Sequence, residues 1–272
     1  WRWLHSHRRR EILDAAYWIA LTDFPVAWWA GRPFMSSSLA PRTGCFDVHK
    51  RSWVPELLER SHAPNLPPIK SAGEVIGGVR SGPLRESGAA SGETLLVAGG
   101  HDHPIAATAI RRFDPTGRID SMGTANLVYG ETGRFDDEAL TEELAFSVPP
   151  SGNGFACLSD FELSAMLGKI ESARDLRAYL SQKRIPGHPP ESWGEWQEPS
   201  AAPDRRVLEQ ASLKARDMFA AMDKAGVPKC RIYTTGGWSR STAFVELRAS
   251  LFGEPIAALG ELELTGIGAA LF

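Results

Sequence analysis

The stretch Thr94–Phe113, TLLVAGGHDHPIAATAIRRF, carries the pattern on which the expected fold depends. A short apolar run, Thr94–Ala98, ends in two glycines, and Pro104 then opens a helical spacing of apolar residues. Proline is favoured in the first turn of a helix, and glycine permits a tight turn before it. The pattern predicts a strand, a tight turn and a helix, with the polar residues 101–103 at the turn.

This turn is a place where a ligand is expected, because open α/β sheets bind ligands at the carboxyl ends of their strands. Asp102 fits two roles there, a helix cap or a general base. His101 and His103 flank it in an H-x-H arrangement that also suits a metal ion, as in a zinc-dependent hydrolase. The residues alone leave these roles open.

A glycine bend marks the next part of the chain. Two β-prone runs, RIDSM (118–122) and NLVYGET (126–132), stand on either side of Gly123 and Thr124. This arrangement predicts a hairpin that bends at the glycine.

The strand, glycine turn and helix are expected to recur near the C-terminus. Arg231–Thr235 is a β-prone run that ends in Gly236 and Gly237, and Ser239 or Ser241 then stands where a helix cap is expected. A last helix is expected from residue 261 onward, where glycines would permit close packing.

Other segments show helical spacing. We expect one helix over 10–29, a second from Asp160, as N-cap, to Arg184, and a third that Asp204 caps. Residues 186–203 are rich in proline and predict a long surface loop or lid. The apolar face of the third helix comprises Leu208, Ala211, Ala215, Met218, Phe219 and Met222.

The alternation of strands and helices predicts an α/β fold. The turn DPTG (114–117) leads into the second group of strands, and we place a domain boundary there. The expected domains are 1–115 and 116–272.

Composition excludes several classes of protein. The 272 residues are 43% hydrophobic and 23% charged, as in ordinary soluble proteins, and the net charge of −3 gives no reason to expect nucleic acid. No apolar run is long enough to predict a membrane span. Three widely spaced cysteines favour neither disulfides nor a zinc ribbon, so a reducing, cytoplasmic location is expected.

Three ordered motifs resemble the FGGY family of carbohydrate kinases, which belongs to the actin-like ATPase superfamily. They are GGHDHPIAA (99–107), DSMGTA (120–125) and GGWSRS (236–241), the last followed by RASLFGEPI and ELTGIGAAL. Upstream, LTDFPVAWWAGRP and SSLAPRTGCFDVHKRSW are also similar to the first-domain segment of the family.

The resemblance implies two ribonuclease-H-like domains around a cleft that holds a sugar and ATP. It implies that Asp102 is the general base, which takes a proton from the sugar hydroxyl as that oxygen attacks the γ-phosphorus, with Mg²⁺ neutralising phosphate charge. His103 is expected near the substrate and His101 is expected to be structural.

The resemblance also assigns nucleotide-binding residues. Gly123 and Thr124 match a loop that approaches the β- and γ-phosphates, and Gly236 and Gly237 match a loop beside the adenosine, where side chains would collide with nucleotide. Two further residues are expected there: Trp238, beside the base, and Ser241, bonded to the ribose or capping the helix.

The chain departs from the family pattern in two places. The first phosphate loop, Asp-x-Gly-Thr/Ser, has no counterpart, and Ser36–Ser38 replace an acidic residue often found near the sugar. The chain begins without Met, so we expect an internal piece of a longer protein, with an incomplete first domain and no turnover of its own.

Three functions therefore remain open: a kinase acting on a free sugar, for which a pentulose or hexulose is expected, or on a polyol; a metal-dependent hydrolase that uses His101 and His103; and a non-catalytic nucleotide-binding remnant. The expected partners of a kinase are a small sugar or polyol, ATP and Mg²⁺, with a homodimer as the expected assembly if there is one.

Overall fold

The computed structural model describes residues 1–135, 141–170, 203–259 and 263–272. Its contacts divide the chain into two compact units. Unit 1 comprises residues 1–108, 146–155 and 265–272, and unit 2 comprises 109–145 and 156–264. The boundary drawn from the sequence at 115/116 stays a prediction; the first break between the units lies at 108/109, and the chain returns to unit 1 twice after it.

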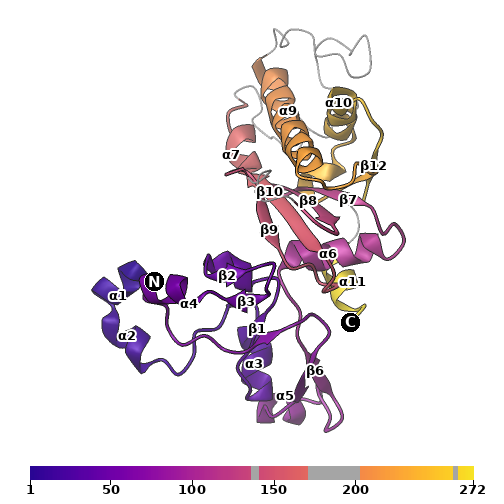
Figure 1. Ribbon diagram of the computed structural model, residues 1–272. Helices are drawn as coiled ribbons and strands as arrows, with labels where there is room; N and C mark the ends of the chain where they lie inside the picture. The colour runs from indigo at the N-terminus through magenta and orange to yellow at the C-terminus, as the bar shows by residue number, and fades with distance from the viewer. Residues whose placement is uncertain (136–140, 171–202, 260–262) are drawn as a thin grey trace. The chain divides into compact units, whose positions relative to one another are not determined.

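A mixed sheet forms the centre of unit 2 (Figure 1). Its strand order is β12-β11-β7-β8-β10-β9, in which β11 is parallel to β7 and β12, and β7 is antiparallel to β8. The strands are β7 (Arg118–Met122), β8 (Asn126–Thr132), β9 (Ala145–Ser147), β10 (Phe155–Phe161), β11 (Ile232–Thr235) and β12 (Ile256–Ala258). The hairpin predicted around Gly123 is confirmed, since Met122 pairs with Asn126.

Two long helices pack against this sheet, α9 (Pro203–Lys224) and α10 (Thr242–Phe252), and Figure 1 shows them side by side. All six apolar residues predicted for the face of α9 are buried. Close packing reaches the backbone: a Cβ on Gly130 of β8 would lie 2.7 Å from Val227 Cγ1, just beyond the end of α9. The described part of unit 2 also contains two short elements, α7 (Leu163–Leu167) and the 3₁₀ turn η3 (Gly237–Arg240).

Unit 1 consists of short elements. Its small apolar core joins α3 to β5 and β6, with Ala27, Phe34, Ile76 and Ala98 buried. The elements are α1 (Arg2–His7), α2 (Arg9–Asp14), α3 (Phe24–Ala30), β1 (Met35–Ser36), η1 (Ala40–Thr43), β2 (Phe46–Asp47), β3 (Ser52–Trp53), α4 (Pro55–Arg60), β4 (Ile69–Lys70), β5 (Val75–Gly78), α5 (Gly82–Glu86), β6 (Leu95–Val97), α6 (Asp102–Arg111) and α11 (Leu264–Ala269), the last two of which cross the unit boundaries.

The single helix predicted over 10–29 is wrong. Helix α2 ends at Asp14, and the backbone is extended at Ala15. Asn65 accounts for the break: its carbonyl accepts a hydrogen bond from Trp18 N, and its side chain donates one to Ala16 O. These long-range bonds compete with the helical ones, and local spacing could not reveal them.

The helix predicted from Asp160 is also wrong at its start. Asp160 lies in strand β10, and the short helix α7 follows Glu162. Pairing within the sheet overrides the helical spacing here. Helix α7 ends at Leu167, and residues 171–184 of the predicted helix, like most of the proline-rich loop predicted over 186–203, lie outside the described residues.

No helix in the described part of the chain combines the length and the apolar character needed to cross a membrane.

Candidate active site

The turn between β6 and α6 places a polar cluster at the start of a helix, as the sequence predicts. Asp102 is the first residue of α6, and its side chain is 63% exposed. The backbone N–H of His103 donates to Asp102 Oδ1 at 2.8 Å. The positive end of the helix dipole also favours a carboxylate at this position. The first helical hydrogen bond runs from Ile105 N to His101 O, so His101 holds the cap position and Asp102 the first position of the helix; the cap role predicted for Asp102 is wrong.

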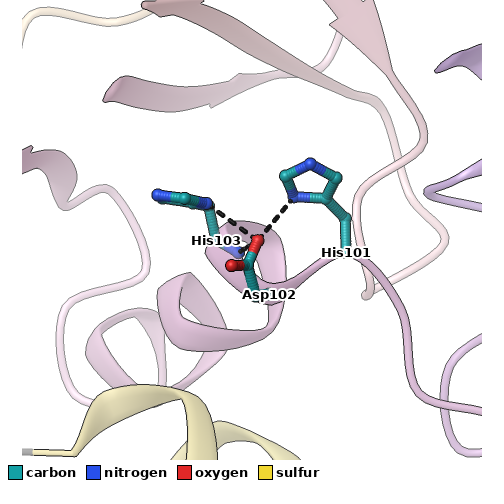
Figure 2. Close-up of side chains that lie close together, drawn as sticks. All are labelled: His101, Asp102 and His103. Atoms are coloured by element: carbon teal, nitrogen blue, oxygen red, sulfur yellow. Dashed lines mark hydrogen bonds and ion pairs between the residues drawn. The ribbon is translucent and has the colours of Figure 1, made fainter. Parts of the chain in front are cut away.

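Both neighbouring imidazoles turn toward the same oxygen of Asp102 (Figure 2). His103 Nδ1 lies 2.8 Å from Oδ1, and His101 Nδ1 lies 3.1 Å from it, at an angle outside the usual hydrogen-bond range. An ionised carboxylate only accepts hydrogen bonds, so each Nδ1 that donates to it carries the proton. Oδ2 is left for another partner.

These contacts keep the carboxylate ionised. The imidazoles of His101 and His103, followed by the backbone N–H of His103, hold the pKa of Asp102 far below its usual range, against the opposing effect of partial burial. Asp102 is therefore negatively charged throughout the neutral pH range.

Ser38, in the loop after β1, supports this turn, a role that the sequence does not predict. Ser38 Oγ accepts a hydrogen bond from His101 N at 2.9 Å, and Ser147 donates to Ser38 O at 3.1 Å. A Cβ on Gly100 would lie 2.5 Å from Ser38 Oγ, so glycine is needed for this approach. Ser38, one of the serines at 36–38, thus positions the turn that carries Asp102.

The neighbouring Ser36 has a separate structural role. Its N–H and hydroxyl both donate to the buried carboxylate of Asp23, the N–H at 2.7 Å and the hydroxyl at 2.5 Å. Burial raises the pKa of Asp23 in spite of these hydrogen bonds. The contact fixes the start of α3 to β1.

Helix α11 packs closely against the first turn of α6. A Cβ on Gly268 would lie only 1.9 Å from the carbonyl oxygen of Ile105. The close packing predicted for the C-terminal glycines is confirmed at Gly268, and it fixes the first turn of the helix that carries Asp102.

In unit 2, the two predicted glycine turns lie against each other. Strands β7 and β11 are parallel neighbours, with Ser121 opposite Thr235, so their carboxyl ends meet. Gly236 has φ +90°, and a Cβ there would lie 2.7 Å from Met122 O and 3.1 Å from Gly123 N. A Cβ on Gly237, by contrast, would meet nothing within 4 Å. One glycine therefore serves the contact between the turns, and the other faces open space.

Ser164 of helix α7 connects the two turns. Ser164 N donates to Thr124 O at 2.8 Å, and Trp238 Nε1 donates to Ser164 Oγ at 3.4 Å. Thr124 is exposed and Trp238 is partly exposed. Ser164 is a second residue that sequence reasoning missed, because its position depends on tertiary structure.

Ser241 caps helix α10. Its hydroxyl accepts a hydrogen bond from Phe244 N at 3.2 Å, and the residue is buried. Of its two predicted roles, capping is confirmed, and a contact with the ribose stays a prediction.

The polar cluster in unit 1 has one further chemical possibility. The ligand atoms of His101, Asp102 and His103 lie within 4.8 Å of one another, a set that could bind a metal ion. In the observed geometry, however, both Nδ1 atoms face the carboxylate oxygen at distances of a proton-mediated contact.

Comparison with known proteins identifies a similar family. Residues 179–272 match the model of the C-terminal domain of the FGGY family of carbohydrate kinases. This match supports a carbohydrate kinase of the FGGY family. A 100-residue segment is 32% identical to the autoinducer-2 kinase of Enterobacter sp. (strain 638); it makes up 36% of this chain and 19% of that kinase.

Solved structures agree with this assignment at the level of the fold. A xylulose kinase from Lactobacillus acidophilus has a TM-score of 0.79 at 17% identity, over 99% of this chain and 61% of that one. A Plasmodium falciparum glycerol kinase with ADP has a TM-score of 0.74 at 15% identity, over 99% of this chain and 60% of that one. The chain thus has the α/β fold of these kinases and spans about three fifths of their length.

Proposed function

We propose that the complete protein transfers the γ-phosphoryl group of ATP to a hydroxyl of a sugar, a pentulose or hexulose, with Asp102 as the general base. The observation that carries this proposal is the exposed, ionised carboxylate of Asp102 at the first turn of α6, in a chain whose residues 179–272 match the FGGY family. The names of its relatives, which include autoinducer-2, xylulose and glycerol kinases, support a small polyhydroxylated substrate.

Asp102 would act through its uncommitted oxygen. Since Oδ1 already receives the contacts from the two imidazoles, Oδ2 would accept the hydrogen bond from the sugar hydroxyl. A low pKa makes Asp102 a weak base, which suits phosphoryl transfer because its transition state is largely dissociative and needs little early proton removal. His103, which is 30% exposed beside it, would contact the sugar through its second ring nitrogen.

The glycine turns of unit 2 would hold the nucleotide. Gly237 supports this, because the space where its side chain would project is open, and backbone N–H groups of such turns bind phosphate or lie flat beside a nucleotide. In this proposal Gly123 and Thr124 face the phosphates, while Gly236, Gly237 and Trp238 lie near the adenosine. The two units would be the two ribonuclease-H-like domains of the family, the first being completed by residues outside this chain.

Mg²⁺ would enter with the nucleotide. The carboxylate nearest in sequence to the Gly123 turn, Asp120, is fully buried and paired with Arg248, so it does not fit the role of a magnesium ligand. The phosphates and water would therefore supply most of the ligands, which is common for this ion.

The test is an assay of the complete protein with Mg·ATP against a panel of ketoses and polyols, with phosphorylated product detected by ³¹P NMR. Formation of a sugar phosphate supports the proposal. Stoichiometric bound zinc with hydrolytic activity and no phosphoryl transfer would replace it with the hydrolase. Nucleotide binding without transfer to any member of the panel would replace it with the non-catalytic remnant.

A further inference from the structure

A fully buried arginine connects the elements of unit 2 that carry the two glycine turns. Arg248 of α10 and Asp120 of β7 both have 0% exposure. Arg248 Nη1 lies 2.9 and 2.7 Å from the two carboxylate oxygens of Asp120 and 2.7 Å from Asn126 Oδ1. Asn126 Nδ2 in turn donates to Asp120 Oδ1 at 2.7 Å. The three side chains therefore form one closed network.

The network lies on both sides of the Gly123 turn. Asp120 is in β7, two residues before the Met122 carbonyl that contacts the Gly236 turn, and Asn126 is the first residue of β8 after the Gly123 turn. Thr234 of β11 joins from the other side, since its hydroxyl donates to Asp120 O at 3.0 Å. Both turns are thus connected to the buried residue Asp120.

Arg248 links Asp120 to α10, the helix that follows the Gly236 turn. It lies in the second turn of α10, whose N-terminus is capped by Ser241 directly after η3. A shift of α10 relative to β7 would therefore press the Gly236 turn against Met122. Only glycine fits there, because a Cβ on Gly236 would lie 2.7 Å from Met122 O.

Stability alone gives a poor reason for this network. Burying an ion pair costs desolvation that its attraction often fails to recover, and apolar side chains of similar size are often as stable. Among the described residues, Arg248 Nε and Nη2 have no hydrogen-bond partner, and the guanidinium carbon lies 5.1 Å from the Phe244 ring. What the network does provide is one fixed geometry between β7, β8 and α10.

We propose that Arg248, with Asp120 and Asn126, is a positioning residue that holds the two glycine turns in the arrangement that accepts a nucleotide. The proposal rests on the proposed function in one respect, the binding of nucleotide by these turns. It adds three residues that make no contact with the nucleotide themselves.

Unit 2 contains a matched control. Arg118, also in β7, is 1% exposed and pairs with Asp223 at 2.6 Å. It lies at the start of the strand, and its Nε donates to Cys230 O, away from the turns at the strand's end. Replacing Arg118 also removes a buried arginine, but it leaves the contacts of both glycine turns in place.

The experiment uses the 272-residue chain and four variants: Arg248→Lys, Arg248→Met, the double variant Asp120→Asn with Arg248→Met, and Arg118→Met. Two properties are measured, amide hydrogen exchange by mass spectrometry and the Kd for Mg·ADP, with the free energy of unfolding determined alongside. The double variant removes both charges, which preserves folding where Arg248→Met alone leaves a buried, unpaired carboxylate. Lysine keeps the charge, but its side chain is one bond shorter than the path to Nη1, the nitrogen that contacts both Asp120 and Asn126.

We expect faster exchange in peptides covering 122–126 and 235–241, and a Kd raised about tenfold or more, in Arg248→Lys and in the double variant, as loss of a charged hydrogen bond predicts. Arg118→Met is expected to lose stability while exchange at the turns and the Kd stay at wild-type values. Wild-type exchange and Kd in the double variant, or equal changes in Arg118→Met, would overturn the proposal. If the wild-type chain binds no Mg·ADP, the nucleotide role fails, and the exchange comparison still decides whether Arg248 positions the turns.

Discussion

At the scale of the residue, Asp102 owes its chemistry to its two neighbours. The sequence predicts the carboxylate and its place at a helix start, because glycine and proline flank it in a strand-turn-helix pattern. It could not predict that both imidazoles turn to one oxygen, since side-chain rotation at three consecutive residues depends on what surrounds them. Ser38 was missed for the same reason: it lies 63 residues from His101 in the chain and touches it in space.

Replacing both histidines by alanine is expected to raise the pKa of Asp102 toward its ordinary value, because the two contacts that favour the charged form are removed. The carboxyl ¹³C chemical shift of Asp102, followed by NMR as a function of pH, measures this directly. An unchanged titration would show that the imidazoles do not set the charge of Asp102.

The same contacts have a pH-dependent effect on stability. Because the folded-state pKa is lowered, their contribution to the free energy of unfolding is present above the ordinary pKa of aspartate and is lost as the pH falls through the folded-state value. The wild type should thus exceed the double alanine variant in stability near neutral pH, by a margin that shrinks in acid. The margin is expected to be small, because the side chain is 63% exposed and water screens it. Urea unfolding at several pH values checks the trend, and a margin that grows in acid would contradict it.

At the scale of the element, the strongest sequence patterns were right and the weaker ones gave way to tertiary contacts. The hairpin of β7 and β8 and the apolar face of α9 follow from local spacing alone. The helix expected over 10–29 fails because Asn65 supplies backbone partners that helical spacing does not encode. The contact between the Gly123 and Gly236 turns depends on β7 and β11 being parallel neighbours, a pairing more than a hundred residues apart that no local pattern specifies.

The two glycines of the second turn should respond differently to alanine. Gly236→Ala places a Cβ 2.7 Å from Met122 O at a φ of +90°, so we expect a loss of about 1–3 kcal/mol in the free energy of unfolding. Gly237→Ala has free space and should keep wild-type stability while raising the Kd for Mg·ADP, since the methyl group would occupy the place proposed for the nucleotide. Denaturant unfolding and calorimetric titration measure the two effects.

Each of these two variants serves as the control for the other. A stable Gly236→Ala would contradict the close contact of the turns. Unchanged affinity in Gly237→Ala would remove the nucleotide from this turn.

At the scale of the whole molecule, the chain forms two units from interleaved segments. The sequence predicts two domains and one boundary, but it gives no sign that residues 146–155 and 265–272 return to unit 1. Gly268 explains the second return, because its missing side chain lets α11 contact the backbone of α6. The C-terminal helix is therefore part of the support of Asp102.

Gly268→Ala is expected to disrupt this support. Its Cβ would lie 1.9 Å from Ile105 O, so α11 must move, at a cost of about 1–3 kcal/mol in unit 1. Hydrogen exchange in peptides covering 101–108 should rise, whereas Gly92→Ala, whose Cβ would meet nothing within 4 Å, should leave it unchanged. Equal exchange in the two variants would show that α11 does not hold α6.

The most direct test of the account is the effect of Asp102→Asn in the complete protein on phosphoryl transfer and on ATP binding. Asparagine keeps the shape of the side chain and loses the proton acceptor, so we expect kcat to fall by about 10²- to 10⁴-fold with the Kd for Mg·ATP unchanged. Sugar phosphorylation at the wild-type rate by Asp102→Asn would contradict the account, because the carboxylate at the start of α6 would then have no part in the chemistry.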